Sequence, residues 1–149
     1  MKKLFVPFLL VLLMLVSCTE SRLDGDWDPF KWDKNKFKNI SADGATLVAT
    51  LKNYDTCWLT STSMDGDIYE GGSIYGSVAG NEDAEPFRDS DGRWCYPGKN
   101  PRLDVQIEGR KVTVVVAPNH DPVPHTFYVS LSLMDCFGPG ITITQKAHE

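Results

Sequence analysis

The sequence predicts an all-β protein, an antiparallel β-sandwich of about seven strands with one long irregular insertion. Apolar and polar residues alternate with a period of two in several short segments, which is the pattern of strands that bury one face. Beyond residue 30 no apolar run has helical spacing, and the nine prolines and twelve glycines of the chain argue against a helical bundle. Two sheets with one apolar face each bury those faces by packing against each other.

The first 17 residues form a segment that precedes this fold. Lys2 and Lys3 stand before an apolar run of 13 residues, Leu4 to Val16. A helix of that length reaches only about 20 Å, short of the roughly 30 Å hydrocarbon core of a bilayer. We therefore interpret residues 1–17 as a cleaved secretory signal. Its removal from the 149 residues leaves 132, enough for one domain with its own core.

The residues that end this signal, Leu15-Val16-Ser17-Cys18, resemble the lipobox of bacterial lipoproteins. The resemblance implies cleavage before Cys18 and attachment of lipid to it. Several acyl chains would anchor the protein stably, where a single chain is marginal. It further implies a location in the cell envelope, lipid-anchored to the outer membrane on its periplasmic or surface face. The alternative is an ordinary signal peptide with a chance cysteine. Residues 18–29 are polar and acidic, as in a flexible stalk.

The expected strands lie in the remaining domain, residues 30–149. Alternation is clearest around Glu108-Gly109-Arg110, which we interpret as the tight turn of a hairpin. A second hairpin spans Thr126 to Gln145, and the two hairpins should supply most of the core. Trp58, in the middle of an expected strand, is assigned to the core. The expected strands are Lys36 to Ile40, Ala45 to Lys52, Thr56 to Ser61, Leu103 to Glu108, Lys111 to Ala117, Phe127 to Leu133 and Ile141 to Gln145.

Between Ser61 and Arg102 about forty residues show weak patterning, with room for one or two weak strands in the glycine-rich segment Ile68 to Val78. An irregular stretch of this length inside a small domain is uncommon and usually has a function. We therefore look for a functional site in this insertion.

Four segments, in this order, resemble the BACON domain, a Bacteroidetes-associated immunoglobulin-like module to which carbohydrate binding is ascribed. The segments are Phe37 to Thr50, Asn53-Tyr54-Asp55 with Trp58-Leu59, Ala117-Pro118-Asn119, and Gly140 to Gln145. The resemblance covers about Trp32 to Ala147. It implies an immunoglobulin-like sandwich on an envelope lipoprotein, with a role in glycan binding or in spacing other domains. The insertion is longer than in the compact members, so their binding surface is not carried over to this chain.

Several classes of function are not expected. The chain without its signal keeps 13 of 15 basic residues against 20 acidic ones, a net charge of −7, which argues against nucleic acid as a partner. Neither Ser73 nor Ser77 completes a nucleophile elbow. His120-Asp121 has the character of a solvated loop pair, and two carboxylates of a glycosidase need a cleft that a small sandwich seldom encloses. We expect no enzyme and no cofactor.

Acidic residues of the insertion offer oxygen ligands for calcium, but aspartate and glycine also build turns, and we expect no metal. The candidate ligands are Asp65, Asp67 and Glu70, or Asp89 and Asp91. With Cys18 as an anchor, three cysteines remain, so at most one disulfide forms among them and its pairing stays open. These are Cys57, Cys95 and Cys136, of which the first and last are expected in the core.

Aromatic residues of the insertion carry the functional hypothesis. Sugar rings present apolar C–H faces that pack on flat aromatic rings, while nearby polar side chains bind the hydroxyls. The proposed ligand-binding residues are Arg93, Trp94, Tyr96, Asn100 and Tyr75. The sequence thus predicts a binding module for a polysaccharide or host glycan. The alternatives are that these rings pin the long loop to the sandwich, and that the protein is a structural accessory contacting an envelope protein.

Overall fold

The computed structural model describes residues 28–70, 85–133 and 136–149, and these residues form strands and no helix. The strands are β1 (Lys36–Ile40), β2 (Ala45–Thr50), β3 (Trp58–Met64), β4 (Asp67–Glu70), β5 (Phe87–Arg88), β6 (Trp94–Pro97), β7 (Leu103–Glu108), β8 (Lys111–Val116), β9 (His125–Leu133), β10 (Cys136–Phe137) and β11 (Ile141–Gln145). The prediction of an all-β protein is confirmed.

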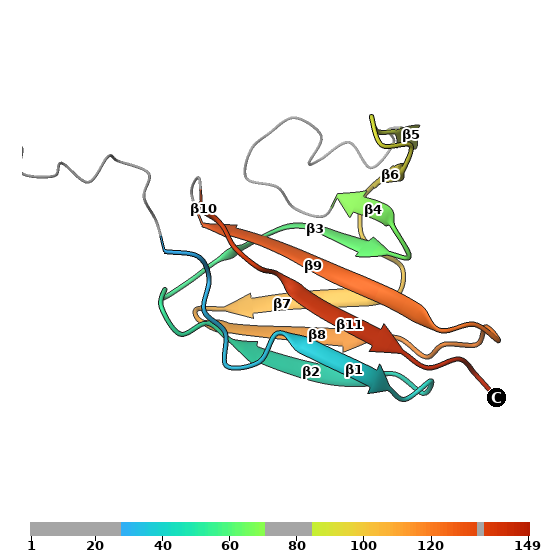
Figure 1. Ribbon diagram of the computed structural model, residues 1–149, viewed down its shortest axis with the longest axis horizontal. Coiled ribbons are helices and arrows are strands. Elements are labelled where there is room, and N and C mark those ends of the chain that lie inside the picture. Colours follow the sequence, from blue (N-terminus) through green and yellow to red (C-terminus); the bar gives the residue numbers. More distant parts are fainter. Residues whose placement is uncertain (1–27, 71–84, 134–135) are drawn as a thin grey trace, which may run out of the picture.

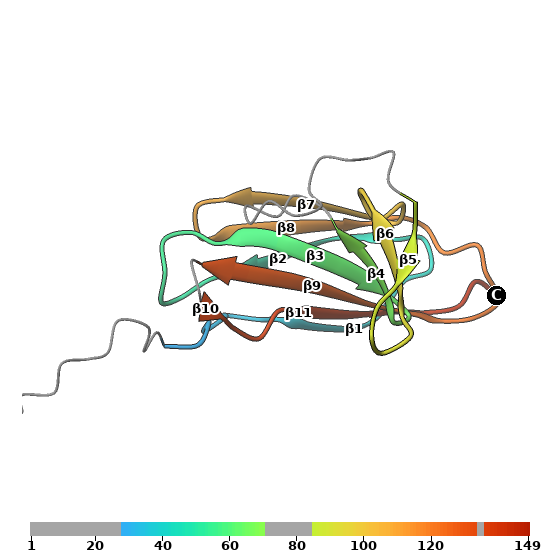
Figure 2. The same cartoon turned by 90° about the horizontal axis from the view of Figure 1, so that it is seen from above.

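The strands form two sheets. The larger has the order β1-β11-β9-β3-β4-β6-β5 with β10 beside β9, and the smaller has the order β2-β8-β7. Figure 2 shows the smaller sheet as a layer beside the strands β3, β9, β11 and β1. The arrangement is that of a β-sandwich. The expectation of purely antiparallel pairing is wrong at two places, because β1 runs parallel to β11 and β4 runs parallel to β6.

The core lies between the two sheets and follows the predicted alternation. In β8, β9 and β11 every second residue is buried and its neighbours are more exposed. Each such apolar side chain stabilises the fold by about 1.5–3 kcal/mol relative to exposure. The fully buried apolar residues of these strands are Val112, Val114, Val116, Phe127, Val129, Leu131, Ile141 and Ile143.

Two tight turns depend on residues with positive φ. Gly109, at φ 58°, connects β7 to β8 in the hairpin that the sequence predicts. Asp65 and Gly66, at φ 51° and 99°, connect β3 to β4. Two successive residues in this region are typical of the turns that match the twist of a hairpin, and aspartate followed by glycine adopts them readily. The second turn leads directly out of the sandwich body into β4.

The chain before β1 is held against the sandwich. Phe30 is buried, with the rings of Trp32 and Tyr54 set edge-on around it at 5.9 and 5.7 Å. The indole N–H of Trp32 donates to the carbonyl oxygen of Pro139 at 2.6 Å. The domain therefore begins well ahead of its first strand.

The expected insertion is not wholly irregular. Strand β3 continues to Met64, three residues past the predicted end at Ser61, and β4, β5 and β6 follow it. The prediction that Trp58 lies in the core is wrong, because its side chain is half-buried. Leu59 pairs with the core residue Leu131 and faces inward, so alternation along β3 places Trp58 on the opposite face, beside Ser132. The remaining part of the insertion, residues 71–84, lies outside the described residues.

Candidate functional site

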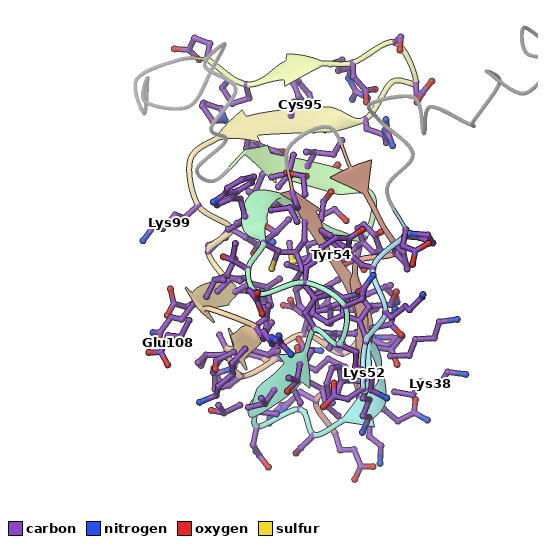
Figure 3. The ribbon with its side chains drawn as sticks, turned by 90° about the vertical axis from the view of Figure 1, so that its left-hand side faces the viewer. Lys38, Lys52, Tyr54, Cys95, Lys99 and Glu108 are labelled. Carbon is purple, nitrogen blue, oxygen red and sulfur yellow. The ribbon has the colours of Figure 1, made fainter. Side chains whose placement is uncertain are left out.

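Strands β4, β6 and β5 form an extension of the larger sheet that we call the aromatic ribbon (Asp67–Glu70, Trp94–Pro97 and Phe87–Arg88). It continues the sheet from β3 (Figure 1), and in Figure 3, where Cys95 marks β6, it lies above the body of the sandwich. The strand of the smaller sheet that contacts β3 is β7, at the edge of that sheet. The ribbon therefore continues the larger sheet past the edge of the smaller one.

The aromatic side chains share one face of this ribbon. Thr62 of β3 is buried and pairs with the core residue Val129 on one side and with Tyr69 on the other. Tyr69 in turn pairs with Tyr96, and Trp94 lies two residues before Tyr96 on the same strand. Side chains alternate between the two faces of a strand, so all three rings project from the same face of the larger sheet as Val129. At β9 this face packs on the smaller sheet.

The rings contact each other and one guanidinium group. Tyr69 and Tyr96 are stacked with their centroids 5.0 Å apart and their planes at 16°. The ring of Trp94 lies 6.2 Å from that of Tyr96, and the guanidinium of Arg88 lies 4.3 Å from the centre of the Trp94 ring. Cation–π contacts of this kind contribute about 0.5–1 kcal/mol at exposed sites. Trp94 is thus held in place while 36% of its surface stays exposed.

Burial also affects the phenol of Tyr69. Loss of solvent, together with the nearby Tyr96, Asp67 and Asp65, raises the pKa of Tyr69 above its ordinary value. The hydroxyl therefore stays protonated at neutral pH and keeps its proton to donate.

Arg93 is engaged in the turn between β5 and β6. Its Nε donates to Oδ2 of Asp89 at 2.8 Å, and its Nη2 donates to Oδ2 of Asp91 at 3.0 Å. The backbone N–H groups of Arg93 and Asp91 both donate to Oδ1 of Asp89, and the first of these bonds lowers the pKa of Asp89 most. Two of the calcium candidates therefore already serve the turn and its arginine.

The other proposed ligand residues lie elsewhere. Asn100, between β6 and β7, is buried, and its Oδ1 accepts from the backbone N–H of Arg102 at 2.9 Å. Its Nδ2 has no hydrogen-bond partner within the described part of the chain. At 5% exposure Asn100 does not share the accessible surface of Trp94. Tyr75 lies outside the described residues.

Sequence reasoning missed Arg88 as a member of the site. A turn pattern in the sequence could have identified it. Phe87-Arg88 and Arg93-Trp94 are separated by Asp89-Ser90-Asp91-Gly92, which is typical of a hairpin turn and places Arg88 opposite Trp94. That pairing brings the guanidinium over the indole.

Metal and membrane features can be stated for the described residues alone. Within residues 28–70, 85–133 and 136–149, no group of three or more His, Cys, Asp or Glu side chains could hold a metal ion. Over the same ranges, no helix has the length and apolar character needed to cross a bilayer. Cys57 is a buried free thiol in the core, as expected, and Cys95 is buried in β6.

Comparison with protein-family models finds no match, and neither does comparison with curated proteins. Among solved structures, the chain is similar to the NMR structure of a protein from Bacteroides thetaiotaomicron. The TM-score is 0.56 at 24% sequence identity, and the match covers 89% of this chain and 98% of that one. At this identity the likeness shows the fold alone.

Proposed function

We propose that the protein is a lipoprotein of the bacterial cell envelope whose immunoglobulin-like, BACON-like domain binds glycans without catalysis. Residues 1–17 are its signal peptide and Cys18 is its lipid anchor to the outer membrane. Residues 18–29 are its stalk. The aromatic ribbon is its binding surface.

The observation that carries this proposal is the exposed ring of Trp94 on the ribbon. Arg88 and Tyr96 fix its orientation, so little side-chain freedom is lost when a ligand packs against it. The turn beside it presents the carboxylate of Asp91, with 68% of that side chain exposed, as an acceptor for hydroxyl groups. An apolar ring with polar groups next to it matches the mixed surface of a pyranose.

Retention on immobilised polysaccharides and mucin glycans tests the binding surface. Trp94→Ala should weaken retention at least about tenfold, equivalent to about 1.4 kcal/mol, and leave the melting temperature within a few degrees of the wild type. The matched control is Val48→Ala, which truncates an exposed apolar residue of β2 (42% exposed) in the smaller sheet. Unchanged retention in Trp94→Ala, or no retention of the wild type on any glycan, would contradict the proposal.

Metabolic labelling with radioactive palmitate tests the anchor independently. The wild type should incorporate the label and partition into the membrane fraction, while Cys18→Ser should do neither. An unlabelled wild type, or a labelled Cys18→Ser variant, would reject lipidation at this residue without bearing on glycan binding.

A further inference from the structure

The start of β9 and the C-terminal segment after β11 lie at one end of the sandwich, the end marked C in Figure 1, and the three histidines of the chain belong to these segments and to the loop before β9. His120 belongs to the loop of residues 117–124, and His125 begins β9 directly after it. The backbone N–H of His148 donates to the carbonyl oxygen of Asp121 at 3.0 Å. His125 alone is buried, with 7% of its surface exposed.

Both ring nitrogens of His125 face carboxylate oxygens. Nδ1 lies 2.6 Å from Oδ2 of Asp65, in the turn between β3 and β4, and Nε2 lies 3.0 Å from Oδ2 of Asp121. A neutral imidazole has one N–H and one lone pair, so it can donate to only one of these oxygens. An imidazolium donates to both.

For a neutral ring to bond both oxygens, one of the two carboxylates would have to be protonated. Protonation of either carboxylate is costly, because each also accepts a hydrogen bond from a second donor. Asp121 Oδ2 accepts from Nη2 of Arg102 at 2.6 Å. Asp65 Oδ1 accepts from the backbone N–H of Thr126 at 2.8 Å. A charged acceptor is favoured by each of these bonds, so the geometry assigns the proton to the ring.

We propose that His125 is a protonation switch, which as an imidazolium ties the turn between β3 and β4 to the loop of residues 117–124. When the ring loses a proton, the shorter bond to Asp65 is kept through Nδ1–H. At the longer contact, Nε2 then carries a lone pair in place of a proton, so it repels the carboxylate of Asp121 and no longer donates to it. Asp121 is left with Arg102 as its partner, and the loop loses one of its ties to β9.

The charged surroundings of the ring support a raised proton affinity. Burial disfavours the imidazolium, but hydrogen bonds to Asp65 and Asp121 outweigh this and raise the pKa of His125 above its ordinary value. The bond to His125 is also the main cause that lowers the pKa of Asp121. Arg102, held behind Asp121, opposes the positive ring.

Among the described residues, the ring nitrogens of His125 bond Asp65 and Asp121 and no other group. The Phe127 ring lies 6.2 Å from that of His125 along β9, and the rings of His120 and His148 contact each other at 6.0 Å. On β4, the phenol of Tyr69 is influenced electrostatically by Asp67, by Asp65 and by Arg102. The switch lies at the turn from which the aromatic ribbon begins.

Nitrogen-15 NMR of the histidine rings, from about pH 5 to about pH 9, tests the proposal on the purified protein. Below its midpoint His125 should show two protonated ring nitrogens, and above it the Nδ1–H tautomer. The backbone amides of Asp65 and Asp121 should shift with the same midpoint. A midpoint at or below that of free histidine, or a neutral ring at pH 6, would overturn the proposal.

Two variants separate a switch from a merely buried ring. Asp65→Asn should lower the midpoint of His125, while Asp67→Asn, which changes a carboxylate two residues away that does not bond the ring, should move it much less. In His125→Gln the amide of Asp121 should no longer follow that midpoint. Equal shifts in both aspartate variants, or an unchanged amide titration in His125→Gln, would contradict the assignment.

Discussion

Tyr69 and Tyr96 stack across two parallel strands, with ring planes at 16° and centroids 5.0 Å apart. The two residues are also direct partners in the register of β4 and β6. Parallel pairing places them on the same face, so the stack helps to hold β6 against β4.

A double-mutant cycle on this pair should show coupling. Tyr69→Ala and Tyr96→Ala should each destabilise the protein, and the double variant should be less destabilised than their sum by about 0.5–1.5 kcal/mol. Unfolding in urea measures this. Tyr69→Ala combined with Val48→Ala should be additive, and additivity in the tyrosine pair would show that the stack contributes nothing of its own.

Gly44 should be far less tolerant of alanine than Gly66. Both have positive φ, 88° and 99°, but a Cβ at Gly44 would lie 2.4 Å from the carbonyl oxygen of Val116, while nothing lies within 4 Å of one at Gly66. We expect a loss of about 1–2 kcal/mol for Gly66→Ala from backbone strain alone. Gly44→Ala should lose about 2–4 kcal/mol, because strand β8 must also shift. Equal losses in urea unfolding would refute the close approach.

Asn119 should be the most sensitive polar residue of its loop. It is fully buried, its Nδ2 donates to the carbonyls of Val123 and Lys146 at 2.8 and 2.9 Å, and its Oδ1 accepts from the backbone N–H of Asp121 at 2.9 Å. Asn119→Ala leaves these three backbone groups without their partner and should cost about 2–4 kcal/mol of unfolding free energy. His120→Ala, at the exposed neighbouring position, should cost less than about 0.5 kcal/mol. A small loss for Asn119→Ala would mean that water replaces the side chain.

Cys57 should resist alkylation in the native protein. Burial raises the pKa of its thiol to about 11, so roughly one molecule in a thousand carries the reactive thiolate at pH 8. Iodoacetamide labelling, resolved by peptide mass spectrometry, should modify Cys57 slowly in buffer and rapidly in urea. Similar rates in both would show that the core opens around this residue.

Asp33 should contribute to stability only above acidic pH. Its Oδ1 accepts from the backbone N–H groups of Thr50 and Lys34 at 2.7 and 2.6 Å, and chiefly the bond from Thr50 lowers the pKa of Asp33 below 3.8. The contribution is therefore present above about pH 4 and is lost as the pH falls through the lowered folded-state pKa. Urea midpoints measured from pH 6 downward should fall less steeply for Asp33→Asn than for the wild type. Identical slopes would contradict this role.

Much of the sandwich was predictable because its signals are local. The hairpin of β7 and β8 is fixed by alternation on both sides of Gly109, and the predicted ends of β1 and β7 agree with the structure. The ribbon was less predictable. Tyr69 and Tyr96 come together because β4 and β6 pair in parallel. Parallel strands need a long connection, so no short turn pattern in the sequence predicts their pairing.

The candidate site is predictable only in part, because neighbours in sequence are not always neighbours in space. Trp94 and Tyr96 do share a face, since they are two residues apart on one strand. Arg93 and Asn100 lie close to them in sequence, but Arg93 bonds Asp89 in its own turn and Asn100 is buried. His125 has no nearby signal in the sequence, because its partner Asp65 lies 60 residues earlier in the chain.

The parallel pairing of β1 with β11 also bears on how the chain folds. Lys36 and Phe37 lie opposite Thr142 and Ile143, so the first strand of the domain finds its place in the sheet only beside the last. A growing chain therefore leaves the buried side chain of Phe37 without its place in the sheet until nearly the whole domain has been made. Contacts this distant in sequence slow the search for the native topology. Completion of the larger sheet is thus a late step of folding.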